Sequence, residues 1–479
     1  MNQLRSGLVV ATLMLAMNGA HAQWEPDLRL TNNPALSLVG GASQKNVAAD
    51  GGRVHAVWHD RREKNEEIYY KRSTDGGVSW GTDVRLTNDT SKSSYPSIAV
   101  SVDVVLVFWN DNRDGNYEIY AKRSTDGGAT WEPDRRLSDG AGWSDTPSAG
   151  VSGSFVHVVW ADERDGETEI YYKRSTDLGA TWGADTRLTN EPAKSNFPSL
   201  SVSGSNIHVV WSDYRDTEFT EPEEIYYKRS TDGGTTWGPD IRLTNEEHWS
   251  DYPCISSSGP FVHAVWYDSR HGGNGGSIYY KRSVDGGNTW KADTLLTDVP
   301  FVSSYASVAA SGSIVHVVFD DARDPAGNEV FYKRSTDGGA SWGADARLTN
   351  NNYSYLPSVA VSGSGIHVVW NDGRDGNTEI YYKRNPTGNT TAIQDVSPSS
   401  SGLQFYPNPA DDALHVNFAS ERRAPVSIVV SDFLGVPVFE RTEVHDAVSI
   451  PTGAIPPGVY FLTVMNGARV ERKPFVIIR

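Results

Sequence analysis

The stretch "STDGGVSW", at Ser73–Trp80, decides the fold because nearly the same letters return along the chain. Its pattern is Ser-x-Asp-x-Gly-x-x-Trp. Further copies begin at Ser124, Ser175, Ser230, Ser283 and Ser335, and the six aspartates are Asp75, Asp126, Asp177, Asp232, Asp285 and Asp337. An aspartate can accept backbone N–H bonds within its own turn, a glycine supplies a positive φ, and a tryptophan caps the hairpin. The motif predicts a repeated structural hairpin rather than a site of chemistry.

The third copy reads "STDLGATW", with Leu178 at the first glycine position and Gly179 at the second. A leucine rarely adopts a positive φ. We therefore expect only the second glycine to be obligatory, as the single position with a positive φ.

A longer unit surrounds this motif and repeats every 51 to 55 residues. Its anchor is an aromatic residue followed by x-Asp-x-Arg, found at Trp58, Trp109, Trp160, Trp211, Trp266, Phe319 and Trp370. Each unit holds four short runs rich in Val, Ile, Tyr and Trp, separated by turn residues, which are typical of β-strands. Seven such units predict an all-β, seven-bladed β-propeller over residues 23–385.

The ends of the array indicate how the ring closes. The last unit stops after "EIYYKRNPTG" and lacks the tryptophan and the fourth run, whereas "WEPDLRLTN" at 24–32 supplies both. We expect this N-terminal strand to complete the last blade and remove a free sheet edge.

Composition and targeting signals exclude some classes of function. The formal charge of −17 disfavours a nucleic-acid partner, and a single cysteine excludes an intramolecular disulfide. Residues 1–22 have a basic start, a short apolar core and "AHA" before Gln23, which predicts a cleaved signal peptide. No later segment is long and apolar enough to suggest a membrane span.

The six motifs resemble the Asp box, or BNR repeat, best known from sialidases. The resemblance covers residues 24 to about 390 and implies a β-propeller whose boxes lie on the face away from the active site. Sialidases use a tyrosine nucleophile activated by a glutamate, an aspartate acid/base and an arginine triad. The Arg-Ile-Pro motif of that family is absent, and its catalytic propeller has six blades, so no catalytic residue is carried over.

Features present in nearly every unit are expected to be structural, because a catalytic centre has to break the repeat. The Asp-x-Arg pairs, such as Asp60 with Arg62, are expected to pin hairpins. The histidines at 55, 157, 208, 263, 316 and 367 are expected to be satisfied core residues, and Cys254 a small buried filler. No cofactor and no metal site is predicted.

The connections that vary between units lie, by propeller convention, on the face opposite the motifs. Those joining the fourth strand to the next first strand carry the expected ligand-binding face, namely Tyr95, Trp143, Phe197, Trp249, Tyr252, Tyr305 and Tyr355. Aromatic rings beside polar groups suit sugar stacking. They suit packing around a central channel equally well.

The connections between the second and third strands carry insertions at 216–224 and 271–277. Loops that depart from a repeat are where function is usually placed. Arg61, Tyr214, Tyr267 and Glu223 (or Glu218) are the residues that could serve sialidase-like catalysis.

The C-terminal part begins after a polar linker at 386–401 and is expected to form a small Ig-like β-sandwich. "FYPNP" at 405–409 and "GVYFLTV" at 458–464 resemble the type IX secretion sorting domain, over residues 402–479. The resemblance implies a Bacteroidota-type cell, Sec export, passage through the outer membrane by the type IX machinery, and a secreted or surface location.

Three functions remain open at this point. The first is binding of an extracellular glycan or protein ligand, the second a sialidase-like exo-glycosidase, and the third a structural or protein-interaction propeller. A monomer is expected.

Overall fold

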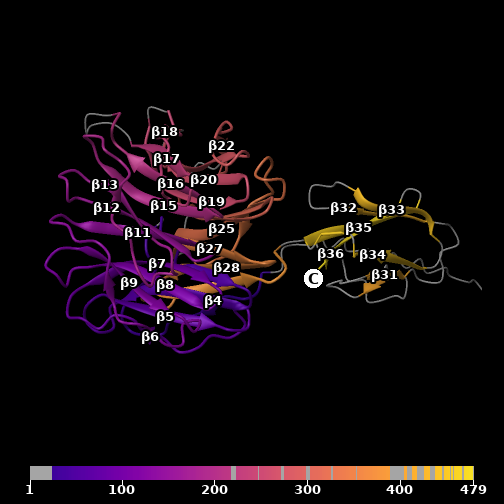
Figure 1. Cartoon of the computed structure of the whole chain (residues 1–479). Helices are drawn as coiled ribbons and strands as arrows, with labels where there is room; N and C mark the ends of the chain where they lie inside the picture. Colours follow the sequence, from indigo (N-terminus) through magenta and orange to yellow (C-terminus); the bar gives the residue numbers. More distant parts are fainter. Residues whose placement is uncertain are drawn as a thin grey trace, which may run out of the picture. The chain divides into compact units, whose positions relative to one another are not determined.

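The computed structural model describes residues 24–388, apart from 42, 217–222, 246–247, 271–274, 298–301, 325–326 and 352. It also describes residues 404–477, apart from 407–412, 418–425, 432–436, 445–446, 454, 457 and 467–468. These ranges contain strands and turns, and no helix in them could span a membrane. The chain divides into two units, Met1–Thr390 and Thr391–Arg479, shown in Figure 1 and described separately here.

The first unit is a β-propeller built from repeated antiparallel sheets (Figure 1). In five of them the strands follow one another in sequence order, whereas β1 joins the sheet of β27–β29 and β2 joins the sheet of β3–β6. We call the sheets blades 1 to 7. The innermost strands are β3 (Val47–Asp50), β7 (Ser93–Ser101), β11 (Ser144–Ser152), β15 (Ser195–Ser203), β19 (Ser250–Ser258), β23 (Ser303–Ser311) and β27 (Ser354–Ser362). The second strands are β4 (Arg53–Asp60), β8 (Val104–Asp111), β12 (Phe155–Asp162), β16 (Asn206–Asp213), β20 (Phe261–Asp268), β24 (Ile314–Asp324) and β28 (Gly365–Asp372).

The outer half of each blade is shorter. The third strands are β5 (Glu67–Ser73), β9 (Glu118–Ser124), β13 (Glu169–Ser175), β17 (Glu224–Ser230), β21 (Ser277–Ser283), β25 (Gly327–Ser335) and β29 (Glu379–Asn385). The outermost are β6 (Val84–Arg85), β10 (Arg135–Arg136), β14 (Thr186–Arg187), β18 (Ile241–Arg242), β22 (Thr294–Leu295), β26 (Ala346–Arg347) and β1 (Leu28–Arg29). In blade 1 a further strand, β2 (Ser37–Leu38), pairs with β4 beside β3.

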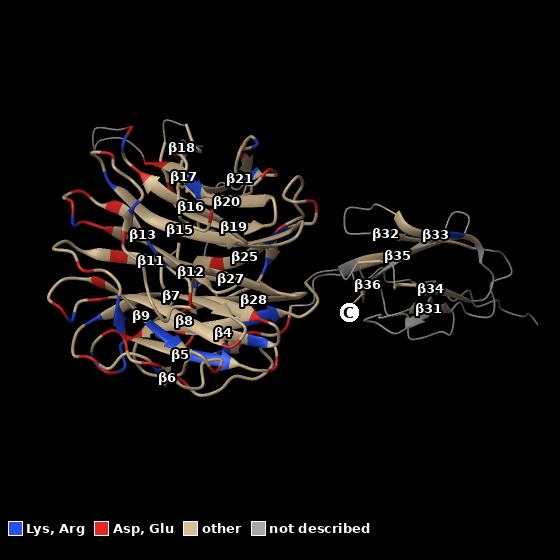
Figure 2. Ribbon diagram, viewed as in Figure 1, with Lys and Arg blue, Asp and Glu red and all other residues tan. Residues whose placement is uncertain are grey.

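Apolar residues explain how the blades stack. In β8, "VVLVFWND", every residue is buried, because both faces of the strand pack against neighbouring sheets. Trp109 and the equivalent aromatic residue of every other blade are fully buried. Charged side chains gather in the loops and toward the strand ends (Figure 2), and the third strands also carry them, as Lys71 and Arg72 of β5 show. A cavity of about 230 Å³ is lined by residues from the innermost strand of each blade.

The N-terminal strand pairs as the sequence predicts. β1 is antiparallel to β29, with Leu28 opposite Tyr382. Arg29 also binds the buried carboxylate of Glu379 at 2.8 Å. Blade 7 is thus completed by the start of the propeller.

The strand register shows which residues lie at each of the two ends of a blade. In blade 2, Ser93 lies opposite Asp111 and Asp111 opposite Glu118, at one end. Ser101 lies opposite Val104 at the other end, where the Ser-x-Asp-x-Gly-x-x-Trp hairpin also begins at Ser124. We call these the variable end and the motif end.

The hairpin motif is held by its own side chains. Asp126 accepts bonds from the Thr130 amide at 2.8 Å and the Thr130 hydroxyl at 2.6 Å, and the Ser124 hydroxyl accepts from the Gly128 amide at 2.8 Å. Side-chain and backbone hydrogen bonds from Thr130 hold the pKa of Asp126 well below its usual range. The motif is therefore a self-contained turn.

The prediction of one positive φ in the motif is wrong. Both glycines of a copy have a positive φ, and Leu178 adopts 55° at the first position. The second position differs by its neighbours: a Cβ on Gly234 would lie 1.9 Å from the hydroxyl of Tyr172 in the preceding blade, whereas nothing lies within 4 Å of one on Gly233. Contact between blades, not backbone conformation alone, makes the second glycine obligatory.

The second unit contains two sheets. One has the order β30 (Gln404–Tyr406), β31 (Ala413–Asn417), β34 (Ala447–Pro451), and the other β33 (Pro437–Val444), β32 (Val426–Ser431), β35 (Gly458–Asn466), β36 (Arg469–Ile477). Buried residues of both sheets, among them Val416 and Leu462, share one core.

Candidate functional site

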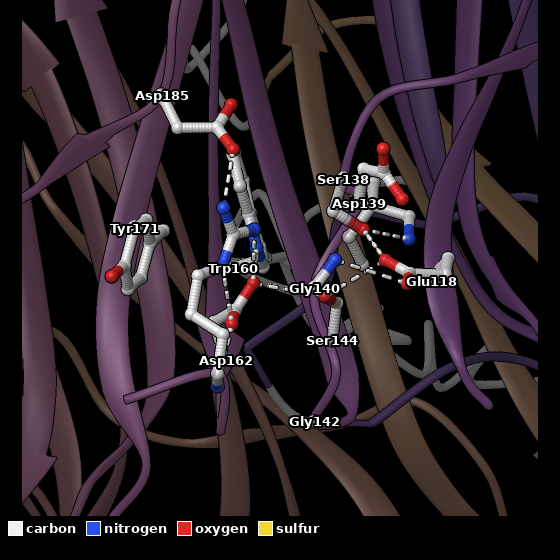
Figure 3. A network of polar contacts seen from close by, with 12 residues as sticks. Glu118, Ser138, Asp139, Gly140, Gly142, Ser144, Trp160, Asp162, Tyr171 and Asp185 are labelled. Carbon is white, nitrogen blue, oxygen red and sulfur yellow. Dashed lines mark hydrogen bonds and ion pairs between the residues drawn. The ribbon is translucent and has the colours of Figure 1, made fainter. Parts of the chain in front are cut away.

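The Asp-x-Arg pairs form a fixed network at the variable end. In blade 3 the Asp162 carboxylate accepts from the Trp160 indole at 2.7 Å and from Arg164 Nε at 2.8 Å (Figure 3). The Arg164 guanidinium also binds Asp185 at 2.7 Å and lies 4.4 Å from the ring centroid of Tyr171. Burial alone would raise the pKa of Asp162, but hydrogen bonds from Arg164 and Trp160 lower it below its usual range.

The arginine contacts of this network recur in every blade, whereas the indole bond is missing in blade 6, where Phe319 replaces the tryptophan. Each arginine stacks over an aromatic ring at 4.0–4.5 Å, in the pairs Arg62–Tyr69, Arg113–Tyr120, Arg164–Tyr171, Arg215–Tyr226, Arg270–Tyr279, Arg323–Phe331 and Arg374–Tyr381. All seven guanidiniums are held by carboxylates of their own blade sheet. The structural interpretation of these pairs is confirmed, and these arginines are not available to bind a substrate carboxylate.

Residues 39–41 and 43–46, between β2 and β3, lie across the inner strands at the variable end. The Lys45 ammonium donates to the Leu200 carbonyl in blade 4 at 2.8 Å, and the Ser43 hydroxyl to the Pro253 carbonyl in blade 5 at 3.1 Å. The Asn46 amide side chain donates to the Pro96 carbonyl in blade 2 at 2.8 Å, and its backbone N–H to the Ser358 hydroxyl in blade 7 at 3.1 Å. This crossing segment connects blade 1 to four other blades by hydrogen bonds. The sequence did not predict it, because its residues are typical of an ordinary loop.

Aromatic side chains meet beside the crossing segment. Phe197, Tyr252 and Tyr305 occupy one equivalent position in blades 4, 5 and 6, each with a φ near 50° at a β-bulge of the innermost strand. Ring centroids are 4.8 Å apart for Phe197 and Tyr252, and 5.1 Å for Tyr252 and Tyr305. These half-buried rings form one continuous aromatic row.

Two carboxylates lie against this row. Asp251 is buried and accepts from the Ser212 hydroxyl at 2.6 Å and from the Tyr252 backbone N–H at 2.7 Å. The Tyr214 hydroxyl donates to the carboxylate of Glu223. Burial and the nearby charge of Asp251 raise the pKa of Glu223 to about 8.

A third carboxylate, Asp320, follows in blade 6. Its side chain is fully buried, the Asn328 amide donates to Oδ2 at 3.3 Å, and Oδ1 has no partner within the described residues. Burial raises its pKa to about 8. Burying a carboxylic acid whose pKa lies above 7 lowers the stability of the fold, and an apolar residue would pack there at no such cost. Acids of this kind are therefore common in functional sites.

We call Phe197, Tyr214, Glu223, Asp251, Tyr252, Tyr267, Tyr305 and Asp320 the aromatic–acid cluster. Tyr267 is included because Asp251 acts on it: burial and then the charge of Asp251 raise the pKa of the Tyr267 hydroxyl. The structure therefore brings Tyr214, Tyr267 and Glu223 to the region where Tyr252 and Tyr305 lie, whereas Glu218 lies outside the described residues. Ser212, Asp251 and Asp320 were missed by the sequence, although each replaces a different residue in the neighbouring repeats.

The other candidates lie around this cluster or apart from it. Trp143 and Trp249 are the most exposed tryptophans, with 57% and 60% of their surface accessible. Tyr95 packs on His59 with centroids 6.0 Å apart, and Tyr355 contacts the Thr378 hydroxyl at 3.4 Å. Arg61 is half exposed and pairs with Glu66 of its own hairpin.

Metal ligands do not gather in this part of the chain. Within the described ranges, no three His, Cys, Asp or Glu side chains are placed to hold a metal ion.

Comparisons with known proteins bear on both units. Residues 404–478 match the family model described as "Secretion system C-terminal sorting domain". A xyloglucanase of Paenibacillus sp. is 24% identical over 310 residues, which cover 60% of this chain and 26% of that protein. The chain thus spans about a quarter of the length of this curated relative.

Solved structures similar to this chain include sialidases at low sequence identity. The Hadza microbial sialidase Hz136 is 15% identical, with a TM-score of 0.45 over 69% of this chain and 73% of that one. The phage phi92 endosialidase is 10% identical, with a TM-score of 0.48 over 94% of this chain and 87% of that one. The sorting-domain match confirms the predicted resemblance and indicates secretion to the cell surface or the extracellular space. The chain couples a β-propeller to a C-terminal sorting domain of the type IX secretion system.

Proposed function

We propose that the propeller is an exported glycan-binding module whose site is the aromatic–acid cluster and the nearby Trp249. The observation that carries the proposal is the row of Phe197, Tyr252 and Tyr305 in mutual contact beside hydrogen-bonding carboxylates. Sugar rings present apolar C–H faces and polar hydroxyls, so aromatic faces next to polar groups fit them.

The acidic side chains of the cluster favour an uncharged glycan over an anionic one. Glu223, Asp251 and Asp320 are acidic side chains with raised pKa values, so an anionic sugar would meet carboxyl groups rather than cations. The Asp-x-Arg arginines are engaged by aspartates of their own blades. Recognition of a sialic acid carboxylate needs an available arginine fork.

The proposed scaffold is a closed ring of seven blades. Pairing of β1 with β29 supports this, as does the cavity lined from every innermost strand. The crossing segment, residues 39–41 and 43–46, would then cover the variable end of the channel and leave the aromatic row as the accessible feature. For the second unit we propose an Ig-like sandwich, supported by the core that its two sheets share.

Binding of the full chain to an array of neutral, amino and sialylated glycans tests the proposal. We expect neutral glycans to bind, and the Trp249→Ala/Tyr252→Ala variant to lose at least about tenfold in affinity, since aromatic anchors dominate such sites. The matched control is Phe155→Ala, an exposed aromatic residue at the motif end. Equal affinity in both variants would place the site elsewhere.

A second candidate, a sialidase-like exo-glycosidase, is favoured by one contact: the Tyr214 hydroxyl donates to Glu223, a pairing that suits an activated tyrosine nucleophile. Hydrolysis of a fluorogenic sialoside by the full chain tests it, with Tyr214→Phe and Arg61→Ala alongside. Turnover lost in Tyr214→Phe and kept in Arg61→Ala would support catalysis. Absence of turnover would leave the binding module.

A further inference from the structure

One interface between blades differs from the rest. Elsewhere a histidine of the second strand binds a tyrosine hydroxyl of the third strand. The Nδ1–hydroxyl distances are 2.6–2.8 Å in the pairs His55–Tyr70, His157–Tyr172, His208–Tyr227, His263–Tyr280, His316–Tyr332 and His367–Tyr382. Blade 2 carries Leu106 and Ala121 at these two positions.

The tyrosine ring has a fixed role at the other interfaces. It meets the tryptophan of the next blade edge-on, with centroids 4.8–5.1 Å apart in the pairs Tyr70–Trp131, Tyr172–Trp237, Tyr227–Trp290, Tyr280–Trp342, Tyr332–Trp24 and Tyr382–Trp80. The phenol ring therefore fills the space between one blade and the hairpin of the next. Without it, that space has to be filled by something else.

Substitutions around Ala121 fill the space only in part. Phe108 stands where most blades carry valine and approaches Trp182 edge-on at 5.9 Å. Leu178 packs against the same core from the hairpin of blade 3. A cavity of about 160 Å³ nevertheless remains. Leu106, Ala121, Pro133, Gly179 and Trp182 form the apolar part of its wall, and Arg123, Glu132, Asp134 and Arg135 form the charged part.

We propose that this cavity is a binding site for a small monocyclic phenol. The repeat itself indicates the shape of the occupant, because six neighbouring interfaces hold the phenol ring of a tyrosine at the equivalent place. The volume is adequate, since an apolar protein cavity of about 150 Å³ takes up a benzene ring. The apolar side of the wall, with Leu106, Ala121 and Trp182, would receive the ring, which gains contacts that the empty cavity lacks.

The rim of the cavity suits the hydroxyl group. Arg123 and Glu132 also line it and bind each other at 2.7 Å, and the Glu132 side chain is half exposed. Arg123 is further held by the Leu178 carbonyl at 2.8 Å. Because Leu106 replaces the histidine that would bind a hydroxyl inside, the hydroxyl of the ligand would face Glu132 at the rim.

Fluorine NMR with 4-fluorophenol and the full chain tests the site. We expect saturable binding with a dissociation constant of about 0.1 to 1 mM, as fits a ligand of so few atoms. Fluorobenzene should bind more weakly, and Glu132→Gln should narrow that difference. A lack of saturation up to several millimolar would overturn the proposal.

Two variants separate this site from binding elsewhere. The set Leu106→His, Phe108→Val, Ala121→Tyr and Leu178→Gly restores the arrangement of the other interfaces and should abolish binding. Ala121→Leu, which fills the cavity by a smaller change, should lower the affinity at least about tenfold. Unchanged binding in whichever variant folds, as judged by its near-ultraviolet circular dichroism, would refute the assignment.

Discussion

The motif end and the variable end of the blades differ in how closely they follow the repeat. At the motif end the six hairpins that carry the motif are built from the same bonds, as Asp75 and Asp126 illustrate. At the variable end, equivalent positions hold Asp145, Asp251 and Tyr355 in different blades. The bonds that recur in each blade stabilise the scaffold. The buried acids differ between blades and do not add to stability, so they indicate a site.

The largest expected effect lies at the motif end. Gly234→Ala should lower the free energy of unfolding by about 4 kcal/mol, because its Cβ would overlap the Tyr172 hydroxyl. Gly233→Ala, the matched control, should cost about 1 kcal/mol, since only the positive φ opposes it. Urea unfolding measures both, and equal losses would show that backbone conformation governs the motif.

The second largest effect is expected for the Asp-x-Arg network at the variable end. Arg164→Ala should lower the free energy of unfolding by about 3 kcal/mol, because Asp162 would stay buried without its cation. Arg164→Lys should recover only part of the loss, since an ammonium cannot replace the fork. A loss below about 1 kcal/mol would contradict the structural role of these arginines.

A third effect concerns an acid that breaks the repeat. The pKa of Asp320 is raised to about 8, so its folded form favours the neutral acid, and stability is lost as pH rises from about 4 to 8. Asp320→Asn should therefore gain stability relative to the unmutated protein as pH rises through this range, and should equal it near pH 4. Melting curves across this range, compared with Asp162→Asn, check the sign. The control carboxylate has a lowered pKa and should show a loss at pH 8.

The smallest effect is expected at Arg61. Its side chain is half exposed and pairs only on the surface with Glu66. Arg61→Ala should change the free energy of unfolding by less than about 0.5 kcal/mol and leave glycan affinity unchanged. A tenfold loss of affinity would move the site from blades 4–6 toward blade 1.

The regular parts of this fold could be predicted from the sequence because each is encoded within one repeat. The hairpins, the Asp-x-Arg pairs and the strand at Leu28 follow from local letters and from the missing piece of blade 7. The crossing segment could not be predicted, since Lys45 and Leu200 meet through the closure of the sheets and not through any local pattern. The same holds for Gly234 and Tyr172, whose contact shows only once two blades are packed.

The aromatic–acid cluster was predicted only in part. The aromatic letters at Phe197, Tyr252 and Tyr305 were visible, but their contact depends on bulges that turn each ring toward its neighbour. Asp320 gave no signal of burial, because an aspartate at a strand end is normally solvated.

Completion of blade 7 by β1 has a consequence for how the chain folds. Arg29 and Glu379 are 350 residues apart in sequence, so this contact forms only when the rest of the propeller is available. Closing a loop of that length costs on the order of 5 kcal/mol in chain entropy. Joining the first strand to the last blade is therefore expected to be a late and slow event in folding, and an incomplete chain would keep two open sheet edges through the whole of its synthesis.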